Sequence, residues 1–129
     1  MAAVAEPGSS GIFTFFMKIG CPCGGVIYDQ TDHLPDKAHL IPDQEWFPTF
    51  DAIDEVIDDV IAKRADADTA YIAIRRILGK AARHVYQCRT CGRLFVDDRQ
   101  SQLHAFTLEP GDTCTEILRN RDGGNQNDA

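Results

Sequence analysis

Apolar residues recur at three- and four-residue spacing in the middle of the chain, which predicts two amphipathic helices. The first covers about 51–64, and its apolar stripe consists of Phe50, Ile53, Val56, Ile57, Val60 and Ile61. The second is capped by Asp68 or Thr69. Its stripe, which we expect to be buried, consists of Tyr71, Ile74, Ile77, Leu78 and Ala81. The other side of the first helix is acidic from Asp51 to Asp59, and that of the second is basic from Arg75 to Arg83.

Shorter runs rich in aromatic and β-branched residues lie on both sides of this helical segment and predict strands. Two of them flank a cysteine pair near the N-terminus, and two more flank a second pair, so each pair is expected at the turn of a hairpin. The connection from 29 to 48 contains three prolines and predicts irregular structure with one short strand near 38–41. The expected strands are 12–19, 26–28, 84–87, 93–96 and 103–108.

Four of the five cysteines form two close pairs, Cys21-Pro-Cys23-Gly-Gly and Cys88-Arg-Thr-Cys91-Gly. A tight turn can point two thiolates inwards, and the glycine after it adopts backbone geometry that a side chain would hinder. Zn²⁺ takes about four such ligands in a tetrahedron, which two pairs supply. The sequence therefore predicts one structural zinc ion held by Cys21, Cys23, Cys88 and Cys91.

Other accounts of these cysteines remain open. The ligands do not distinguish zinc from iron, and four free thiols or a reversible dithiol–disulfide switch also fit the pattern. The fifth cysteine, Cys114, makes the number odd, which disfavours a full disulfide framework. We expect Cys114 to be unliganded in a turn, although Cys114, His33 or His39 could each replace a predicted ligand. His84 and His104 lie on expected strands and are interpreted as structural.

The two cysteine turns and their adjoining strands resemble the zinc-ribbon and rubredoxin-like families, whose sites are built from two such knuckles. The resemblance does not extend to the helices, and the pair Cys21-Pro-Cys23-Gly is one residue shorter than the usual Cys-Pro-x-Cys-Gly. Cys-x-Cys-Gly followed by Cys-x-x-Cys-Gly-Arg-Leu-Phe also resembles small uncharacterised bacterial proteins. The implied fold is α+β, with a small antiparallel sheet of zinc-ribbon type closed by a Cys₄ site.

Because the gap between the pairs is far longer than a minimal ribbon needs, we expect a two-helix insertion between the knuckles, at about 50–83. The domain as a whole is expected to span 12–118. A leader of small residues (1–11) and a polar tail (119–129) are predicted to be disordered. Met17 begins Met-Lys-Ile-Gly-Cys and is an alternative start.

The net charge of −7 and pI of about 4.9 describe an acidic protein. Such a chain is a poor candidate for wrapping a phosphate backbone and a better one for binding a basic protein. The sequence contains neither a secretory signal nor an apolar run of the ~18 residues that a membrane span needs. We therefore expect a cytoplasmic protein whose thiols stay reduced. The oligomeric state is left open.

The sequence has no phosphate-binding loop, nucleophile elbow or zinc-protease helix, and a Cys₄ site is closed, so we expect no enzyme activity. The leading hypothesis is a non-enzymatic zinc-binding protein-interaction module. By analogy of charge and size, acidic neutralising (immunity-type) partners of basic nucleases are one class that fits. The alternatives are a nucleic-acid-associated zinc ribbon, based on the basic residues between Arg75 and Arg93, and a rubredoxin-like electron carrier. Trp46 and Phe47 are either a surface anchor or core residues at the start of the first helix.

Overall fold

The computed structural model describes residues 13–15, 18–30 and 32–121, which fold as two compact units. The helical unit is His39–Arg83, and the β unit combines Met1–Ala38 with His84–Ala129. The chain therefore leaves the β unit, forms the helical unit and returns. The predicted disordered leader (1–11) lies outside the described residues, as does the predicted tail (119–129) except for its first three residues.

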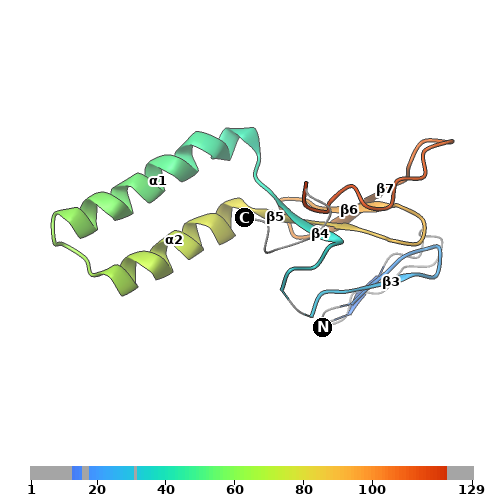
Figure 1. Cartoon of the computed structure of the whole chain (residues 1–129), viewed down its shortest axis with the longest axis horizontal. Coiled ribbons are helices and arrows are strands. Elements are labelled where there is room, and N and C mark those ends of the chain that lie inside the picture. The colour runs from blue at the N-terminus through green and yellow to red at the C-terminus, as the bar shows by residue number, and fades with distance from the viewer. Residues whose placement is uncertain (1–12, 16–17, 31, 122–129) are drawn as a thin grey trace. The chain divides into compact units, whose positions relative to one another are not determined.

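The β unit contains two sheets (Figure 1). In the first, β2 (Lys18–Gly20) is the central strand and pairs antiparallel with β1 (Phe13–Phe15) and β3 (Val26–Tyr28). The second sheet has the order β4-β5-β6-β7, in which β5, β6 and β7 pair antiparallel. Its strands are β4 (Lys37–Leu40), β5 (Arg83–Gln87), β6 (Leu94–Asp97) and β7 (Leu103–Phe106).

The α+β class is confirmed, but the prediction of a single sheet is wrong, because each cysteine-bearing hairpin belongs to its own sheet. The expected strand at 12–19 is also two strands, β1 and β2, which pair with each other. β3, the other strand that pairs with β2, has only three residues. A continuous strand would leave backbone groups unpaired beyond the end of β3, whereas folding back pairs them.

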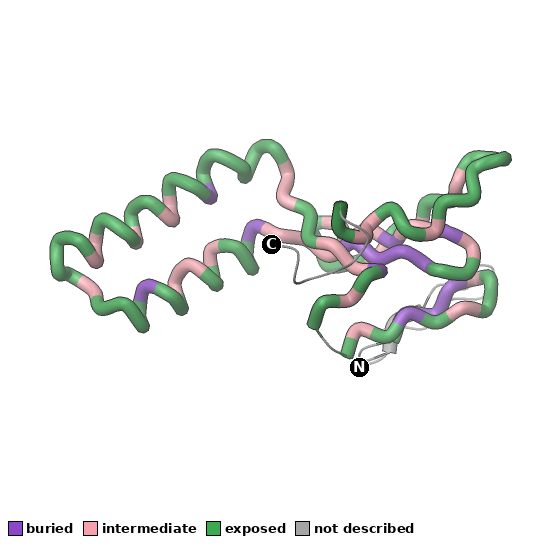
Figure 2. The backbone as a smooth tube through the Cα atoms, in the orientation of Figure 1, coloured by how far each residue is buried: buried purple, intermediate pink, exposed green. Residues whose placement is uncertain are grey.

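The core of the β unit lies between the two hairpins. It is formed by Ile19 and Ile27 of the first sheet and by Tyr86 and Phe95 of the second, with Cys21 and Cys88 buried among them. Phe95 is fully buried at 0% exposure. Apolar residues from both sheets share this one cluster, and the buried stretches of the chain lie mainly in the strands of the β unit (Figure 2).

The helical unit is an antiparallel pair of helices, α1 (Asp43–Ile61) and α2 (Ala67–Ala81) (Figure 1). α1 begins at Asp43 rather than near residue 51, and Pro48 lies inside it. A proline at this position removes one N–H from the hydrogen-bond ladder and crowds the carbonyl four residues earlier, yet its φ is helical and α1 continues through it. The cap of α2 is Asp66, not Asp68 or Thr69 as predicted. Its carboxylate accepts a hydrogen bond of 2.8 Å from the N–H of Thr69.

The expectation that the apolar stripes are buried holds for only part of each helix. Tyr71 and Leu78 of the predicted α2 stripe are exposed, as are Phe50, Ile57 and Ile61 of α1. The buried helical positions are instead the small residues Thr49, Ala70 and Ala81. Each stripe is wider than the contact between two helices, so a pair buries one side of the stripe and leaves the other in solvent.

Trp46 and Phe47 are also exposed on α1, so the interpretation of these residues as core is wrong. None of the described helices is long and apolar enough to cross a membrane.

Candidate metal centre

The first cysteine turn connects β2 to β3 and is closed by two backbone hydrogen bonds. The N–H of Cys21 donates to the carbonyl of Gly25, and the N–H of Gly24 donates to the carbonyl of Cys21, each at 2.9 Å. Gly24 has φ +97°, which a residue with a side chain rarely adopts. Cys21 and Cys23 thus leave the turn only two residues apart, with both side chains available to the same ligand.

The second turn, between β5 and β6, repeats this pattern with one extra residue. The N–H of Cys88 donates to Arg93 at 2.9 Å, and the N–H of Gly92 donates to Cys88 at 2.8 Å, with φ +84° at Gly92. The shortening of the first pair noted in the sequence therefore removes one residue without changing the hydrogen-bonding scheme. The two turns are variants of one motif.

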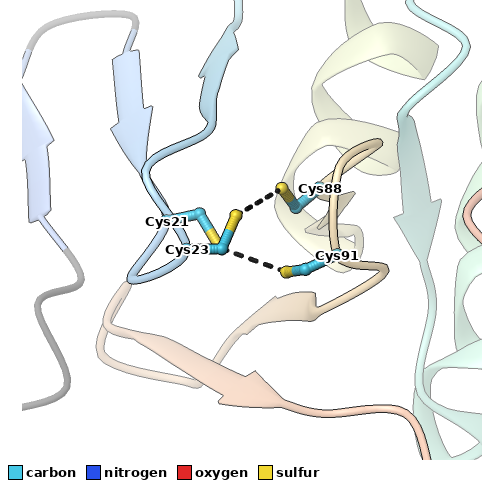
Figure 3. A group of neighbouring side chains, drawn as sticks. All are labelled: Cys21, Cys23, Cys88 and Cys91. Carbon is cyan, nitrogen blue, oxygen red and sulfur yellow. Dashed lines mark hydrogen bonds between the residues drawn. The ribbon is translucent and has the colours of Figure 1, made fainter.

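The four cysteines of the two turns lie together (Figure 3). Their sulfur atoms are all within 4.8 Å of one another, although the pairs are far apart in the sequence. The two closest sulfur pairs each join the two turns: Cys21 to Cys91 at 3.5 Å, and Cys23 to Cys88 at 3.6 Å. Among the described residues, these four are the one group of this kind arranged to hold a metal ion.

The sulfur spacing fits a tetrahedral ion. Four sulfurs at about 2.3 Å from a zinc ion lie about 3.8 Å from one another, between the shortest approaches seen here and the 4.8 Å limit of the group. A disulfide needs a bond of about 2.05 Å, and all four cysteines are free thiols. The arrangement can hold one soft divalent ion, and iron fits the same donor set as well as zinc.

The four thiols differ in burial and in pKa. Cys21 and Cys88 are buried, Cys91 is half-buried and Cys23 is exposed. Burial raises the pKa of Cys21 to about 12. Burial also raises the pKa of Cys91, but hydrogen bonds from the Arg93 backbone, from Cys21 and from the Arg93 side chain outweigh it, and the pKa falls to about 7. The site thus favours a thiolate at Cys91 first.

Two donors to sulfur come from the turns themselves. The guanidinium Nη1 of Arg93 lies 3.2 Å from Cys91 Sγ and 3.8 Å from Cys21 Sγ, and the N–H of Gly25 lies 3.4 Å from Cys23 Sγ. Such donors disperse the negative charge that four thiolates leave around a divalent ion. Nothing in the sequence indicated that the Arg93 side chain turns back onto the site.

A buried hydrogen-bonding group behind the second turn was also missed. The side chain of Gln87, 1% exposed, donates to the carbonyls of Gly92 and Cys114 and accepts from the N–H of Ile117. It therefore fixes the segment after β7 against the turn. In the sequence Gln87 looks like an ordinary strand residue, and the only hint of this role is that it is polar and lies next to Cys88.

The connection before β4 is held to the second turn by the buried carboxylate of Asp36. This group accepts from Arg89 at 2.9 Å and from Arg119 at 3.4 Å, while the Asp36 carbonyl accepts from the N–H of Gln87. Asp36 was not singled out in the sequence, because its two arginine partners lie 53 and 83 positions away.

The remaining sequence candidates do not join the cysteine group. Neither His33, His39 nor Cys114 belongs to the group of four in the described residues. Cys114 is exposed, and its N–H donates to Asp112 in a local turn. His104 is exposed, and its Nε2 lies 2.7 Å from the carboxylate of Asp98.

No curated protein and no solved structure matches this chain. A family model described as a domain of unknown function (DUF8617) matches residues 17–110. The match covers more than half of the chain and contains both cysteine pairs and both helices. The chain belongs to the DUF8617 family.

Proposed function

We propose that this chain is a non-enzymatic module in which one structural zinc ion, held by Cys21, Cys23, Cys88 and Cys91, stabilises the β unit. The observation that carries the proposal is the convergence of four thiols from two distant turns to within 4.8 Å. With the protein supplying all four ligands, the ion has no open position for water or substrate, so its role is structural. The zinc-ribbon resemblance of the turns agrees with this role.

Metal analysis of the purified full chain tests the site. We expect one zinc per chain and no visible colour, whereas a rubredoxin-like iron site would be red. Cys88→Ser should lose the metal and lower the melting temperature by roughly 10 °C or more, because zinc binding contributes directly to folding. Cys114→Ser is the matched control and should keep both the metal and the melting temperature.

The shortened first turn receives its own test. Cys21→Ser and Cys23→Ser should each lower the zinc content as much as Cys91→Ser does. If both variants kept one tightly bound zinc, the first turn would not be half of the site. A chain that bound no metal but formed a Cys21–Cys91 or Cys23–Cys88 disulfide under mild oxidation would instead be a dithiol switch.

We place the binding function on the outer side of α1. Asp51, Glu55 and Asp58 are exposed at spacings of four and three residues, so they form one acidic strip along the helix. An acidic strip on a chain of net charge −7 complements a basic protein and speeds its association. A neutralising partner of a cationic enzyme is one class of protein with these properties.

A charge-reversal pair tests this surface. Asp51→Lys/Asp58→Lys should abolish the salt-sensitive capture of a basic partner identified by mass spectrometry. Asp32→Lys/Glu109→Lys changes the charge equally at exposed positions elsewhere and should leave the capture intact. Equal capture by both variants would remove the acidic strip from the function.

The nucleic-acid alternative loses part of its basis in the structure. Of the basic residues that suggested it, Arg89 forms an ion pair with Asp36 at 2.8 Å, and Arg93 is bound to the cysteine sulfurs. Neither side chain is free to follow a phosphate backbone. We therefore expect no mobility shift of single-stranded DNA or RNA at physiological salt, and a shift under those conditions would favour the alternative.

A further inference from the structure

The two helices expose large apolar side chains that nothing in the described part of the chain covers. Each is between 41% and 73% exposed. On α1, the rings of Trp46 and Phe50 pack edge to face with their centroids 5.0 Å apart, so part of this surface is already ordered. Six of these exposed side chains are Trp46, Phe50, Ile57 and Ile61 on α1, and Tyr71 and Leu78 on α2.

These six side chains lie on one face of the helix pair, whereas Phe47 and Ile72, which are also exposed, lie outside it. Successive residues of a helix are rotated by about 100° around its axis. In each helix the least exposed residues pack against the other helix, and the exposed apolar residues lie roughly 90° around the axis from them. Because the helices are antiparallel, rotations of the same sense bring both sets to the same side. Phe50 is then level with Leu78, and Ile57 with Tyr71. We call this surface the apolar face.

Charged residues of opposite sign border the apolar face at similar heights on its two edges. On the same helical geometry, Asp54 follows the apolar residues at the outer edge of α1, and Arg75 does so at the outer edge of α2. Both are exposed, and neither has an ion-pair partner among the described residues. They lie at nearly the same height along the pair but on opposite edges, so they cannot reach each other within one chain.

We propose that the apolar face packs against the same face of a second copy of this chain, forming a four-helix bundle with its two-fold axis parallel to the helices. This symmetry places α1 over α2 of the second copy. It brings Asp54 level with Arg75 of the second copy. By the two-fold symmetry, Arg75 is likewise level with Asp54 of the second copy, so the dimer contains two such pairs. Each copy thereby supplies the charge that the other lacks.

A second two-fold symmetry would also stack the two apolar faces, and the charges favour the first over it. A two-fold axis perpendicular to the helices places α1 over α1 and α2 over α2 of the second copy. Asp54 would then meet Asp54, and Arg75 would meet Arg75, a repulsive arrangement. The acidic strip at Asp51, Glu55 and Asp58 points away from the apolar face in either case. The inference therefore concerns a different surface from the proposed function and does not depend on it.

Sedimentation analysis of the full, metal-loaded chain tests the dimer. We expect a concentration-dependent dimer whose dissociation constant rises by about 10- to 100-fold in Ile57→Glu, because an apolar side chain is replaced by a charge in the interface. Ile72→Glu is the matched control. Ile72 is similarly exposed, at 52% against 45%, but lies about 60° beyond Arg75 around α2 and so outside the apolar face, and its variant should dimerise like the wild type.

A charge swap tests the symmetry. Asp54→Arg and Arg75→Asp should each weaken the dimer several-fold, and the double variant should restore it to near the wild-type affinity. Asp51→Arg, which changes the charge equally outside the face, should have little effect. If Ile57→Glu lost helical circular dichroism, the charge-swap set would decide, because it leaves the apolar residues intact.

Three results would overturn the proposal. They are a monomer at every concentration, equal effects of Ile57→Glu and Ile72→Glu, and a double charge variant no better than its single parents. If the chain stayed monomeric and its apolar face bound another protein instead, that result would also overturn the proposal. Loss of metal binding or of partner capture, by contrast, would refute the proposed function and leave the dimer unaffected.

Discussion

Gly24 and Gly25, adjacent in the first cysteine turn, are required for different reasons. At Gly24 the backbone has φ +97°, but nothing lies within 4 Å of where a Cβ would be. At Gly25 the added atom would lie 3.0 Å from Cys88 Sγ and 3.2 Å from Thr90 Oγ1. Gly24 therefore shapes its own turn, whereas Gly25 lets the second turn approach the first.

Gly25→Ala should weaken metal binding by about tenfold, because the Cys88 sulfur has to move from its place beside the other three. A competition titration against a chromophoric chelator measures this. Gly79→Ala, in the middle of α2 with nothing within 4 Å of its Cβ, is the control and should bind metal like the wild type. Unchanged affinity in Gly25→Ala would mean that the two turns do not need this approach.

Gln87→Leu should lower the free energy of unfolding by about 2–4 kcal/mol, because it leaves two buried carbonyls and one N–H without their partners. Urea denaturation of the metal-loaded protein measures the loss. Gln30→Leu, at an exposed position, should change the stability by no more than about 0.5 kcal/mol. An equal effect of the two variants would contradict the role assigned to Gln87.

At this scale the sequence reveals what is local and misses what depends on distant partners. The four cysteines were predicted as one site because spacing and a following glycine are properties of a few consecutive residues. Arg93, Asp36 and Gln87 were not predicted, because their roles depend on which distant segments the fold brings beside them. The Arg93 charge was even assigned to a different function, since a side chain's direction cannot be read from its position in the sequence.

Among the elements, the β6–β7 hairpin depends most visibly on one ionised group. The carboxylate of Asp98 accepts from the N–H groups of Gln100 and Gln102 at 2.7 and 3.0 Å and lies 2.7 Å from His104. The hydrogen bond with His104, followed by those from the backbone, lowers the pKa of Asp98 from 3.8 to about 2. The turn therefore uses the charged form of this aspartate.

A lowered pKa in the folded state contributes stability that is complete above the unfolded value and is lost as the pH falls through the folded one. Asp98→Asn should therefore be less stable than the wild type near neutral pH, by an amount that shrinks as the pH falls from about 4 towards 2. Urea midpoints of both proteins across this range measure the difference. Metal lost in acid affects both proteins alike, so a difference that stayed constant would contradict the assignment.

The helices show where periodicity succeeds and where it fails. It predicted both helices and their apolar stripes, because the three- and four-residue spacing is repeated over several turns. It placed the start of α1 late, because Pro48 reads as a boundary although the helix accommodates it. It also could not tell a stripe that is covered from one that is exposed, since Ile57 and Ile53 are equally apolar and only packing distinguishes them.

At the level of the whole molecule, the four cysteines join segments that the helical unit separates in the sequence. The β unit is formed from two stretches of chain, up to Ala38 and from His84, and each contributes one cysteine turn. Bringing such distant segments together costs loop-closure entropy, which a metal ion bound by both turns would offset. The sequence predicted this arrangement from cysteine spacing, but the division into a β unit and a helical unit at residues 38 and 84 required the structure.

Removal of the metal should therefore affect the two units differently. We expect hydrogen exchange followed by mass spectrometry to show large loss of protection in peptides covering β2, β3, β5 and β6 after chelation. Peptides of α1 and α2 should change less, because the helical unit contains none of the four cysteines. Cys88→Ser without chelator should reproduce the pattern, and Cys114→Ser should not. A uniform loss across both units would show instead that the ion stabilises the chain as one cooperative structure.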